Sequence, residues 1–505
     1  MKSSTSIAGL YKAGCRQRNR LGNGSCIAVA LFCLIKINPA AAVNWLMLQG
    51  TEHPFAAEHQ FLGLIQPAYT YDRSSSLSGL VDEPGLPEFS ANNGERLAMT
   101  SVSPWFDSNS EFHLRRAKFG VRGIFTGALR NSFTAKMNYF TLVEVAPSLM
   151  TYDPFAERAR VIAFDHLSLT FNHIPSARIR AGLFKTPGAE ELLQGVHTLD
   201  YIEFTDFTSR ELLERFVSGA EKPAASPASP SMGTATNTAY GINAARDWGI
   251  QLFNAFRNDL WELSYAVMLG RGEAIQQNST SSDYPELYLY ASAEYDLPGG
   301  LGTSKNGVKV YSWYQKGKRE FSSDPDRHEY DRKRYGVGSR LLGRFFKSKY
   351  KYRLAAELMY ADGMIFIAPA GGVANGNVSN GNLQIAAESG NKSRGATIDI
   401  GFYPDNRWQF DLRFHRHELL YQTTATINPG NERILSDTTL GLNYHFSRKI
   451  RLTFNYVFRN AEAPTSYASS DSFPPDNAAA ALTANVDTIV NNVEDRILLQ
   501  LTWLL

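Results

Sequence analysis

Apolar and polar side chains alternate in segments of about ten residues from about residue 110 to the end of the chain. Successive side chains of a β-strand point to opposite faces, so each segment has one apolar and one polar face. Strands of this length with one apolar face are typical of a barrel that spans an outer membrane. The strands of a soluble β-sandwich alternate too, so strand number and loop lengths must separate the two folds. In the segment 408–415 the apolar residues are Trp408, Phe410, Leu412 and Phe414, and the polar residues are Gln409, Asp411, Arg413 and His415.

About sixteen alternating segments can be counted along the chain. Bacterial outer-membrane barrels have an even number of antiparallel strands. The count therefore predicts an all-β fold, a transmembrane antiparallel β-barrel of about sixteen strands that occupies residues 61–505. The segments lie near 61–71, 111–123, 131–141, 161–172, 177–185, 248–256, 260–269, 286–296, 308–316, 335–343, 352–361, 396–403, 408–417, 437–446, 451–459 and 496–503.

The connections between these segments alternate between short and long. Outer-membrane barrels have short periplasmic turns and long external loops. A soluble sandwich has no reason to place its long loops at one end, so the pattern favours the barrel. It therefore also predicts that the protein is located in the outer membrane of a Gram-negative type cell. Short turns occur at 172–176, 257–259, 404–407 and 447–450, and long connections at 72–110, 186–247, 362–395 and 460–495.

The first 42 residues have the features of a secretory signal peptide. A basic stretch with Arg16, Arg18 and Arg20 is followed by an apolar core at 27–37 and by three alanines that end at Ala42. Small residues after an apolar core form a cleavage site. The sequence therefore predicts export and cleavage after Ala42.

Cleavage there changes the chemistry available to the mature chain. Cys15, Cys26 and Cys33 are the three cysteines, and all lie in the leader. The mature chain thus has no disulfide, thiol nucleophile, thiolate metal site or attached haem. The leader also holds six basic and no acidic residues, so 51 basic and 49 acidic residues become 45 and 49, and the formal net charge changes from +2 to −4. Residues 43–60 remain as an N-terminal periplasmic segment, and any preference for anions must come from local placement of charge.

The polar rows of the predicted strands supply candidate pore-lining residues. Walls of opposite charge create a transverse field that favours small polar or charged solutes. Every aqueous pore needs a polar lining, so the basic row is open to two interpretations, an anion-attracting wall and an ordinary wetted surface. The basic candidates are Arg116, Lys118, Arg122, Lys136, Arg178, Arg180, Lys185, Arg413 and Arg451. Carboxylates on the later rows are Glu262, Glu294, Glu357, Asp399 and Asp411.

No residues point to a cofactor or to catalysis. His415, His417 and Glu418 lie close together on one strand, but a third and fourth metal ligand cannot be identified, so no metal site is predicted. There is no nucleic-acid-binding module, no assignable Ser-His-Asp arrangement and no run of about eighteen apolar residues that could form a transmembrane helix. The chain is therefore predicted to need no cofactor, to bind no nucleic acid and not to be an enzyme.

Three segments and the last hairpin carry a family resemblance. They are 111–123 (EFHLRRAKFGVRG), 178–187 (RIRAGLFKTP), 199–204 with 209–211 (LDYIEF and SRE), and 440–444 with 454–457 (LGLNY and FNYV). In this order they resemble the phosphate-selective porin O and P family over most of the mature chain. The resemblance implies a homotrimeric porin of sixteen strands whose long third loop, 186–247 here, folds inward as a constriction. Candidate constriction residues are Glu190, Glu191, Glu203, Asp206, Arg210 and Glu211.

The leading hypothesis is an outer-membrane porin for passive diffusion of small hydrophilic solutes, with a preference for anions such as phosphate. The arginine ladder and lysine cluster of the family cannot be aligned residue by residue, so the family name does not identify the solute. Expected partners are outer-membrane lipid, the solutes and further copies in a homotrimer. The alternative is a porin-like barrel around a multihaem cytochrome, whose haems would lie on that partner. An outer-membrane lipid hydrolase has little support, and the apolar segment 363–369 has no assigned role.

Overall fold

The computed structural model describes most of residues 44–505. These residues all belong to one unit, Ala42–Leu505. The predicted signal peptide, 1–42, and part of the predicted periplasmic segment, 43–60, lie outside the described residues. Described are residues 44–48, 58–82, 90, 93–94, 110–146, 152–153, 158–159, 162–218, 232–235, 237–240, 245–258, 260–272, 285–299, 305–320, 329–344, 348–363, 366–368, 383–386, 392–421, 430, 432–467 and 476–505.

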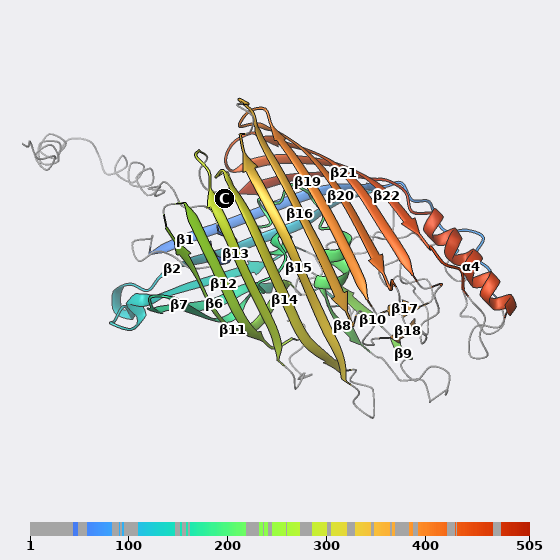
Figure 1. Ribbon diagram of the computed structural model, residues 1–505, viewed down its shortest axis with the longest axis horizontal. Coiled ribbons are helices and arrows are strands. Elements are labelled where there is room, and N and C mark those ends of the chain that lie inside the picture. Colours follow the sequence, from blue (N-terminus) through green and yellow to red (C-terminus); the bar gives the residue numbers. More distant parts are fainter. Residues whose placement is uncertain are drawn as a thin grey trace, which may run out of the picture. The chain divides into compact units, whose positions relative to one another are not determined.

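Sixteen antiparallel strands follow one another in chain order and close into a barrel (Figure 1). The barrel closes where the first strand pairs with the last, for example Thr70 with Leu498. The predicted fold class and strand count are confirmed. The strands are β1 (His59–Asp72), β2 (Ser110–Ile124), β3 (Met137–Glu144), β6 (Ala163–Ile174), β7 (Ala177–Lys185), β11 (Arg246–Arg257), β12 (Trp261–Gly270), β13 (Glu286–Asp296), β14 (Gly307–Glu320), β15 (Glu329–Gly343), β16 (Lys351–Asp362), β19 (Ser393–Tyr403), β20 (Trp408–Leu419), β21 (Arg433–His445), β22 (Ile450–Glu462) and β23 (Arg496–Leu504).

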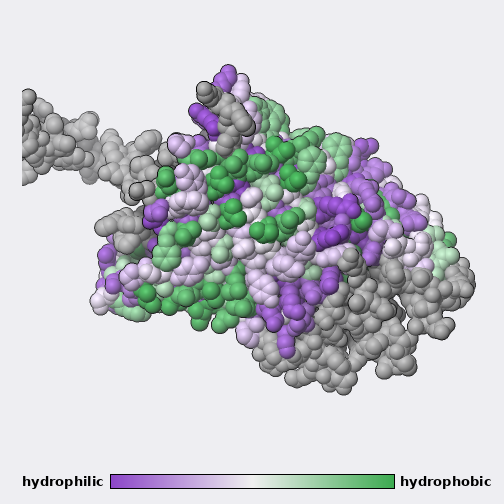
Figure 2. All heavy atoms as spheres, viewed as in Figure 1, coloured by the Kyte–Doolittle hydropathy of each residue, from purple (hydrophilic) through white to green (hydrophobic). Residues whose placement is uncertain are grey.

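Side chains alternate between the inside and the outside of the barrel, as β20 shows. Trp408, Phe410 and Phe414 are 39%, 46% and 44% exposed, whereas Gln409 and Asp411 are buried. Figure 2 shows apolar side chains in green over the outer face of the strands. A closed barrel with an apolar outer surface suits a lipid bilayer, because unpaired backbone groups are costly in lipid.

One irregularity in the β1–β2 ladder changes which side chains enter the lumen. Gln66 pairs with Arg116 but the next residue, Pro67, pairs with Leu114, so Arg115 is an extra residue on β2. Proline has no N–H to donate and is tolerated at such a bulge. The extra residue shifts the alternation by one, and Arg115 and Arg116 are therefore both buried.

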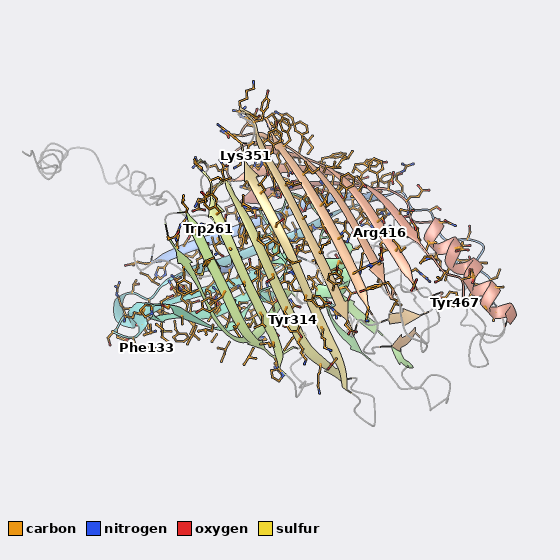
Figure 3. All side chains as sticks on the ribbon, in the orientation of Figure 1. Phe133, Trp261, Tyr314, Lys351, Arg416 and Tyr467 are labelled. Atoms are coloured by element: carbon orange, nitrogen blue, oxygen red, sulfur yellow. The ribbon has the colours of Figure 1, made fainter. Side chains whose placement is uncertain are left out.

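The predicted strand at 131–141 is wrong in its first half. Asn131 Oδ1 accepts hydrogen bonds from the backbone N–H groups of Phe133 and Thr134, both at 2.9 Å. Such local bonds give the backbone an alternative to a strand ladder. Two 3-10 turns, η3 (Gly127–Leu129) and η4 (Thr134–Lys136), consequently precede β3. Phe133, labelled in Figure 3, directly precedes η4 and is exposed.

The predicted long loop at 460–495 contains a helix, α4 (Asp476–Asn491), that strand counting missed. Leu482, Val486 and Ile489 form a buried cluster with Leu77 on the chain that follows β1. Their spacing of four and three residues is that of an apolar helix face. Tyr467, labelled beside α4 in Figure 3, belongs to the same cluster. No helix among the described residues is long and apolar enough to cross a membrane.

The described parts of the long connections contain three small sheets. The apolar segment 363–369 contributes β17 (Phe366–Ala368), which pairs with β18 (Leu383–Ala386). β18 also pairs with β9 (Met232–Ala235), which belongs to the connection between β7 and β11. Two long connections are therefore joined by backbone hydrogen bonds. The other two sheets are β8 (Glu214–Ser218) with β10 (Asn237–Tyr240), and β4 (Tyr152–Asp153) with β5 (Arg158–Ala159).

Candidate functional site

The first part of the connection between β7 and β11, residues 186–213, lies against the inner wall of the barrel and is called the inner loop below. It contains α3 (Glu190–Leu193) and a π-helical turn, η5 (Thr208–Leu212). Inward side chains of β21 and β22 satisfy its backbone groups, as buried backbone requires. The contacts are Ile202 N to Asn455 Oδ1 (2.8 Å), Asn443 Nδ2 to Asp200 O (2.9 Å) and Arg451 Nη2 to Leu199 O (2.7 Å).

Carboxylates of the inner loop form ion pairs with buried cations on the barrel wall. Almost every acidic residue that the sequence assigns to a constriction is used in this way. The cations Lys309, Arg334, Arg353, Arg413, Arg451 and Arg496, on β14 to β23, are called the anchoring wall below. The ion pairs are Glu190 with Lys309 (2.7 Å), Glu191 with Arg413 (3.3 Å), Glu211 with Arg334 (3.2 Å), Glu203 with Arg496 (2.9 Å), and Asp200 with Arg353.

Glu211 is the most enclosed of these carboxylates. Ser393 Oγ donates a hydrogen bond to Glu211 Oε1 at 2.8 Å, and Arg332 and Arg334 each donate to the Glu211 carbonyl oxygen at 3.1 Å. Burial by itself raises the pKa of Glu211, but the guanidinium of Arg334 outweighs it and holds the pKa at about 2, against an ordinary value of 4.5. Glu211 is therefore ionised across the physiological pH range and fixes the end of the inner loop.

The histidines of β20 also hold the inner loop. His415 Nε2 accepts a hydrogen bond from the backbone N–H of Phe207 at 3.2 Å, and His417 lies 3.5 Å from Glu211. Both histidines are buried. No group of three or more His, Cys, Asp or Glu side chains that could hold a metal ion occurs among the described residues. The pair His415 and His417 thus has a positioning role on the wall.

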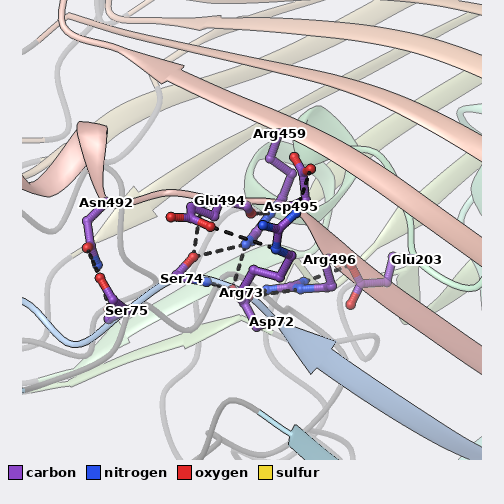
Figure 4. A network of polar contacts seen from close by, with 10 residues as sticks. All are labelled: Asp72, Arg73, Ser74, Ser75, Glu203, Arg459, Asn492, Glu494, Asp495 and Arg496. Carbon is purple, nitrogen blue, oxygen red and sulfur yellow. Dashed lines mark hydrogen bonds and ion pairs between the residues drawn. The ribbon is translucent and has the colours of Figure 1, made fainter.

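A polar network joins the inner loop to the seam of the barrel, where β1 meets β23 (Figure 4). Arg496 on β23 donates to Asp72 on β1 at 2.7 Å and to Glu203 of the inner loop at 2.9 Å. Arg459 on β22 donates to the second oxygen of Asp72 at 2.8 Å. Burial by itself raises the pKa of Glu203, but Arg496 and Arg115 outweigh it and lower the pKa. A single buried arginine therefore links first strand, last strand and loop.

A second group of cations, most of them buried, lies on β2, β7 and β11 and is called the basic wall below. Two carboxylates, Glu144 and Asp165, face this group: Lys118 Nζ lies 2.6 Å from Asp165 and 3.6 Å from Glu144, and Arg246 lies 3.0 Å from Asp165. Lys185 Nζ instead donates to the carbonyl of Leu192 at 2.8 Å. The basic wall consists of the buried Arg115, Arg116, Lys118, Arg180 and Arg246 and of the half-buried Lys185.

Three arginines of the basic wall keep unused donors. Arg116 Nη1 donates to Gln66 at 3.0 Å, and the Arg180 guanidinium lies over the ring of Phe253, 4.4 Å from its centroid. Within the described part of the chain, Nε and Nη2 of Arg116, both Nη atoms of Arg180 and all three nitrogens of Arg115 have no hydrogen-bond partner. Arg115 has only a long ion pair, 3.9 Å, with Glu203. Guanidinium donors in this state are suited to bind an anion.

The other predicted pore-lining residues do not share one environment. Lys136 is exposed in the turn before β3, so its assignment to the lumen is wrong, because the strand begins one residue later. Arg122, which donates to Gln60 at 3.1 Å, and Arg178 are only half-buried. Arg413 and Arg451 belong to the anchoring wall. Of the remaining constriction candidates, Asp206 is half-buried, and the Arg210 side chain lies outside the described residues.

Sequence reasoning missed several cations that line the lumen. The alternation does not identify Arg115, because the bulge that turns this side chain inward leaves no mark in the sequence pattern. Arg332 and Arg334 lie on β15, which begins at Glu329, several residues before the predicted strand at 335–343. Arg353 lies on a predicted strand and has the inward parity, so closer attention to parity would have found it.

A small cavity of about 80 Å³ remains between the inner loop and strands β14 to β20. A space of this size holds a few water-sized molecules. Its lining mixes both signs of charge. Lining residues include Glu191 and Tyr201 of the inner loop and Arg340, Arg353, Glu357 and Asp399 of the wall.

The fold and outer surface define an outer-membrane-type β-barrel whose lumen holds part of its own chain. No protein-family model matches the chain, and no curated protein sequence matches it, so the resemblance to phosphate-selective porins has no further support. The chain is similar to an anion-selective porin from Comamonas acidovorans, with 11% identity over 88% of this chain and 99% of that chain and a TM-score of 0.47. It is also similar to OprB of Pseudomonas putida, with 7% identity over 89% of this chain and 94% of that chain and a TM-score of 0.47. The outer membrane channel DcaP of Acinetobacter baumannii is similar with 10% identity over 91% of this chain and 100% of that chain and a TM-score of 0.43. At these identities and scores the likeness assigns neither solute nor selectivity.

Proposed function

We propose that the chain is an outer-membrane porin that lets small hydrophilic solutes diffuse passively. The observation that carries the proposal is a closed sixteen-stranded barrel with an apolar outside and a lumen lined by buried charged residues. A lumen lined in this way can be wetted, and a loop folded against the wall restricts passage by size. We further propose that residues 1–42 are the leader that directs export, which sequencing of the mature N-terminus tests.

The proposed solutes include small anions, and the basic wall supports this. Glu144 and Asp165 face the six cations there, and Glu203 reaches Arg115 only at 3.9 Å. Among the described residues, three of the arginines have donors without a hydrogen-bond partner. An anion such as phosphate or chloride satisfies such donors with charge-assisted hydrogen bonds. Phosphate itself is suggested by the family resemblance alone, and homotrimeric association has the same origin.

The alternative function as a sheath for a cytochrome is not favoured. A partner protein inside the barrel needs an open lumen, whereas the inner loop is held there by five ion pairs. An enzymatic function has no supporting observation in the described residues.

Conductance of the purified protein in a planar bilayer tests the proposal. A salt gradient gives the reversal potential, and phosphate is titrated in. We expect discrete conductance steps, in groups of three if the protein is a trimer, and a reversal potential biased toward anions. Block by phosphate would show that phosphate binds in the pore. A correctly folded barrel that shows no steps would refute the porin function.

A further inference from the structure

A short segment that precedes the barrel in the sequence lies inside it. Asn44 Nδ2 donates hydrogen bonds to Glu262 Oε1 at 2.7 Å and to Ser264 Oγ at 2.6 Å, and all three residues are buried. Glu262 and Ser264 share the inward face of β12. The segment therefore lies in the lumen, against a wall strand from a distant part of the chain.

The same asparagine begins a single helical turn, α2 (Trp45–Leu48). Asn44 Oδ1 accepts from the N–H groups of Leu46 at 3.1 Å and Met47 at 3.4 Å. One side-chain amide thus caps the turn with its oxygen and binds the wall with its nitrogen. A helix this short is not stable by itself, so its position must depend on packing.

That packing is against the inner loop. Trp45 and Leu46 are buried in one apolar cluster with Leu192 and Leu193 of α3. Trp45 also lies close to Gly195, where a Cβ atom would lie 3.3 Å from the indole ring. The segment is therefore wedged between the inner face of β12 and the inner loop.

The segment 44–48 lies at the end of the barrel that carries the short turns. Glu262 is the second residue of β12, directly after the tight turn that follows β11. The chain enters the wall at β1, six positions from β12 in the strand order. The segment therefore contacts a wall strand that is six positions around the barrel from β1.

From these contacts we infer that residues 44–48 form a lumenal brace, an apolar wedge that holds the inner loop and limits the current through the barrel. The inference rests on the proposed porin function. Release of the brace removes the apolar support of α3 from one side and clears space at the mouth with the short turns. The brace therefore sets the open size of the channel.

Conductance of a double variant, Trp45→Ala with Leu46→Ala, tests the current-limiting role. We expect a higher unit conductance and more frequent transitions between levels than in the unchanged protein. The matched control is Trp261→Ala with Leu263→Ala, because these residues have the same types but lie on the outward face of β12. Equal unit conductance in the unchanged protein and the double variant would overturn the inference.

A cysteine pair tests the position of the brace without any current. In a chain with Cys15, Cys26 and Cys33 replaced by serine, Asn44→Cys and Ser264→Cys place two thiols where the side chains now touch. Oxidation should join them in the folded barrel, shift the gel mobility of the unfolded chain and keep conductance low until reduction. The control pair, Asn44→Cys with Thr453→Cys, should stay unjoined.

The two experiments separate failure of the brace from failure of the porin function. A missing cross-link in a barrel that conducts would overturn the brace alone. A cross-link in a barrel that never conducts would refute the porin function and the current-limiting role together, and would leave the position of the segment established.

Discussion

The basic wall and the anchoring wall face the same lumen with the same kind of residue, yet their arginines do different things. On the anchoring wall, Arg334, Arg353, Arg413 and Arg496 each meet a carboxylate of the inner loop. On the basic wall, Arg116 and Arg180 meet no carboxylate within ion-pair distance and keep free donors within the described structure. For these six arginines, an acidic partner separates those that hold the inner loop from those whose donors remain available to a solute.

The largest expected effect comes from breaking the anchoring wall at the seam. Arg496→Ala leaves Asp72 and Glu203 without the buried partner they share, although Arg459 still contacts Asp72. Removal of one partner from a buried ion pair costs about 3 to 5 kcal/mol. We expect the free energy of unfolding to fall by about that amount, as measured by urea unfolding in detergent.

The control for this variant is Arg394→Ala, which removes an exposed arginine paired with Glu418 at 2.6 Å. Exposed ion pairs contribute about 0 to 1 kcal/mol. Similar losses in the two variants would mean that the seam arginine does not anchor the barrel.

The features of the fold that follow from alternation could be predicted from the sequence. The strand β20 illustrates this, since Trp408 and Phe410 face outward as their parity requires. Alternation does not reveal a register shift, so the inward turn of Arg115 was not predictable. Alternation also does not show where a side chain competes for backbone hydrogen bonds. Asn131 accepts two such bonds, and a turn forms there in place of the first half of the predicted strand 131–141.

The candidate site was harder to predict, because partners come from distant parts of the chain. Glu211 and Arg334 are far apart in the sequence, and nothing local in either segment indicates that they meet. The loop acids are candidates because the family resemblance implies that loop 186–247 folds inward, but their role as anchors depends on which wall cation each one reaches. The helix α4 was missed for a different reason: its apolar residues repeat at helical spacing inside a connection classified only by length.

The next effect in size concerns pH and the anchor at Glu211. The pKa of Glu211 is about 2 when the inner loop is anchored, against 4.5 for an ordinary glutamate. Glu211 therefore binds a proton more tightly in the released loop than in the anchored loop. Stabilisation of the anchored loop is therefore complete above pH 4.5 and is lost as the pH falls to about 2. The difference corresponds to roughly 3 kcal/mol.

We expect conductance to become unstable on acidification across this window, as single-channel recordings at successive pH values would show. Glu211→Gln removes the titrating group, so that variant should fluctuate already at neutral pH and lack this transition. An identical acid transition in both proteins would assign it to another group.

Selectivity gives a smaller effect and tests the basic wall directly. Arg180→Glu and Arg116→Glu each change the local charge by two units at positions with free donors. We expect the ratio of anion to cation permeability to fall by up to about tenfold, which corresponds to about 1.4 kcal/mol. Reversal potentials in a salt gradient measure it. Lys136→Glu makes the same charge change in an exposed turn and should leave the ratio unchanged. If Lys136→Glu shifts the permeability ratio as much as Arg180→Glu or Arg116→Glu, the basic wall does not set selectivity.

The smallest expected effect is at Arg122, which has the charge of the basic wall without its burial. Arg122 lies near the end of β2, is half-buried and donates to Gln60 at 3.1 Å. Water and salt screen such a charge, and exposed charges interact by well under about 1 kcal/mol. Arg122→Glu should therefore shift the permeability ratio in the same direction as Arg180→Glu but by no more than about twofold, and less at high salt. A shift as large as that of Arg180→Glu would place the selective step at the mouth of the barrel, because a solute would then be sorted before it reached the donors of the basic wall.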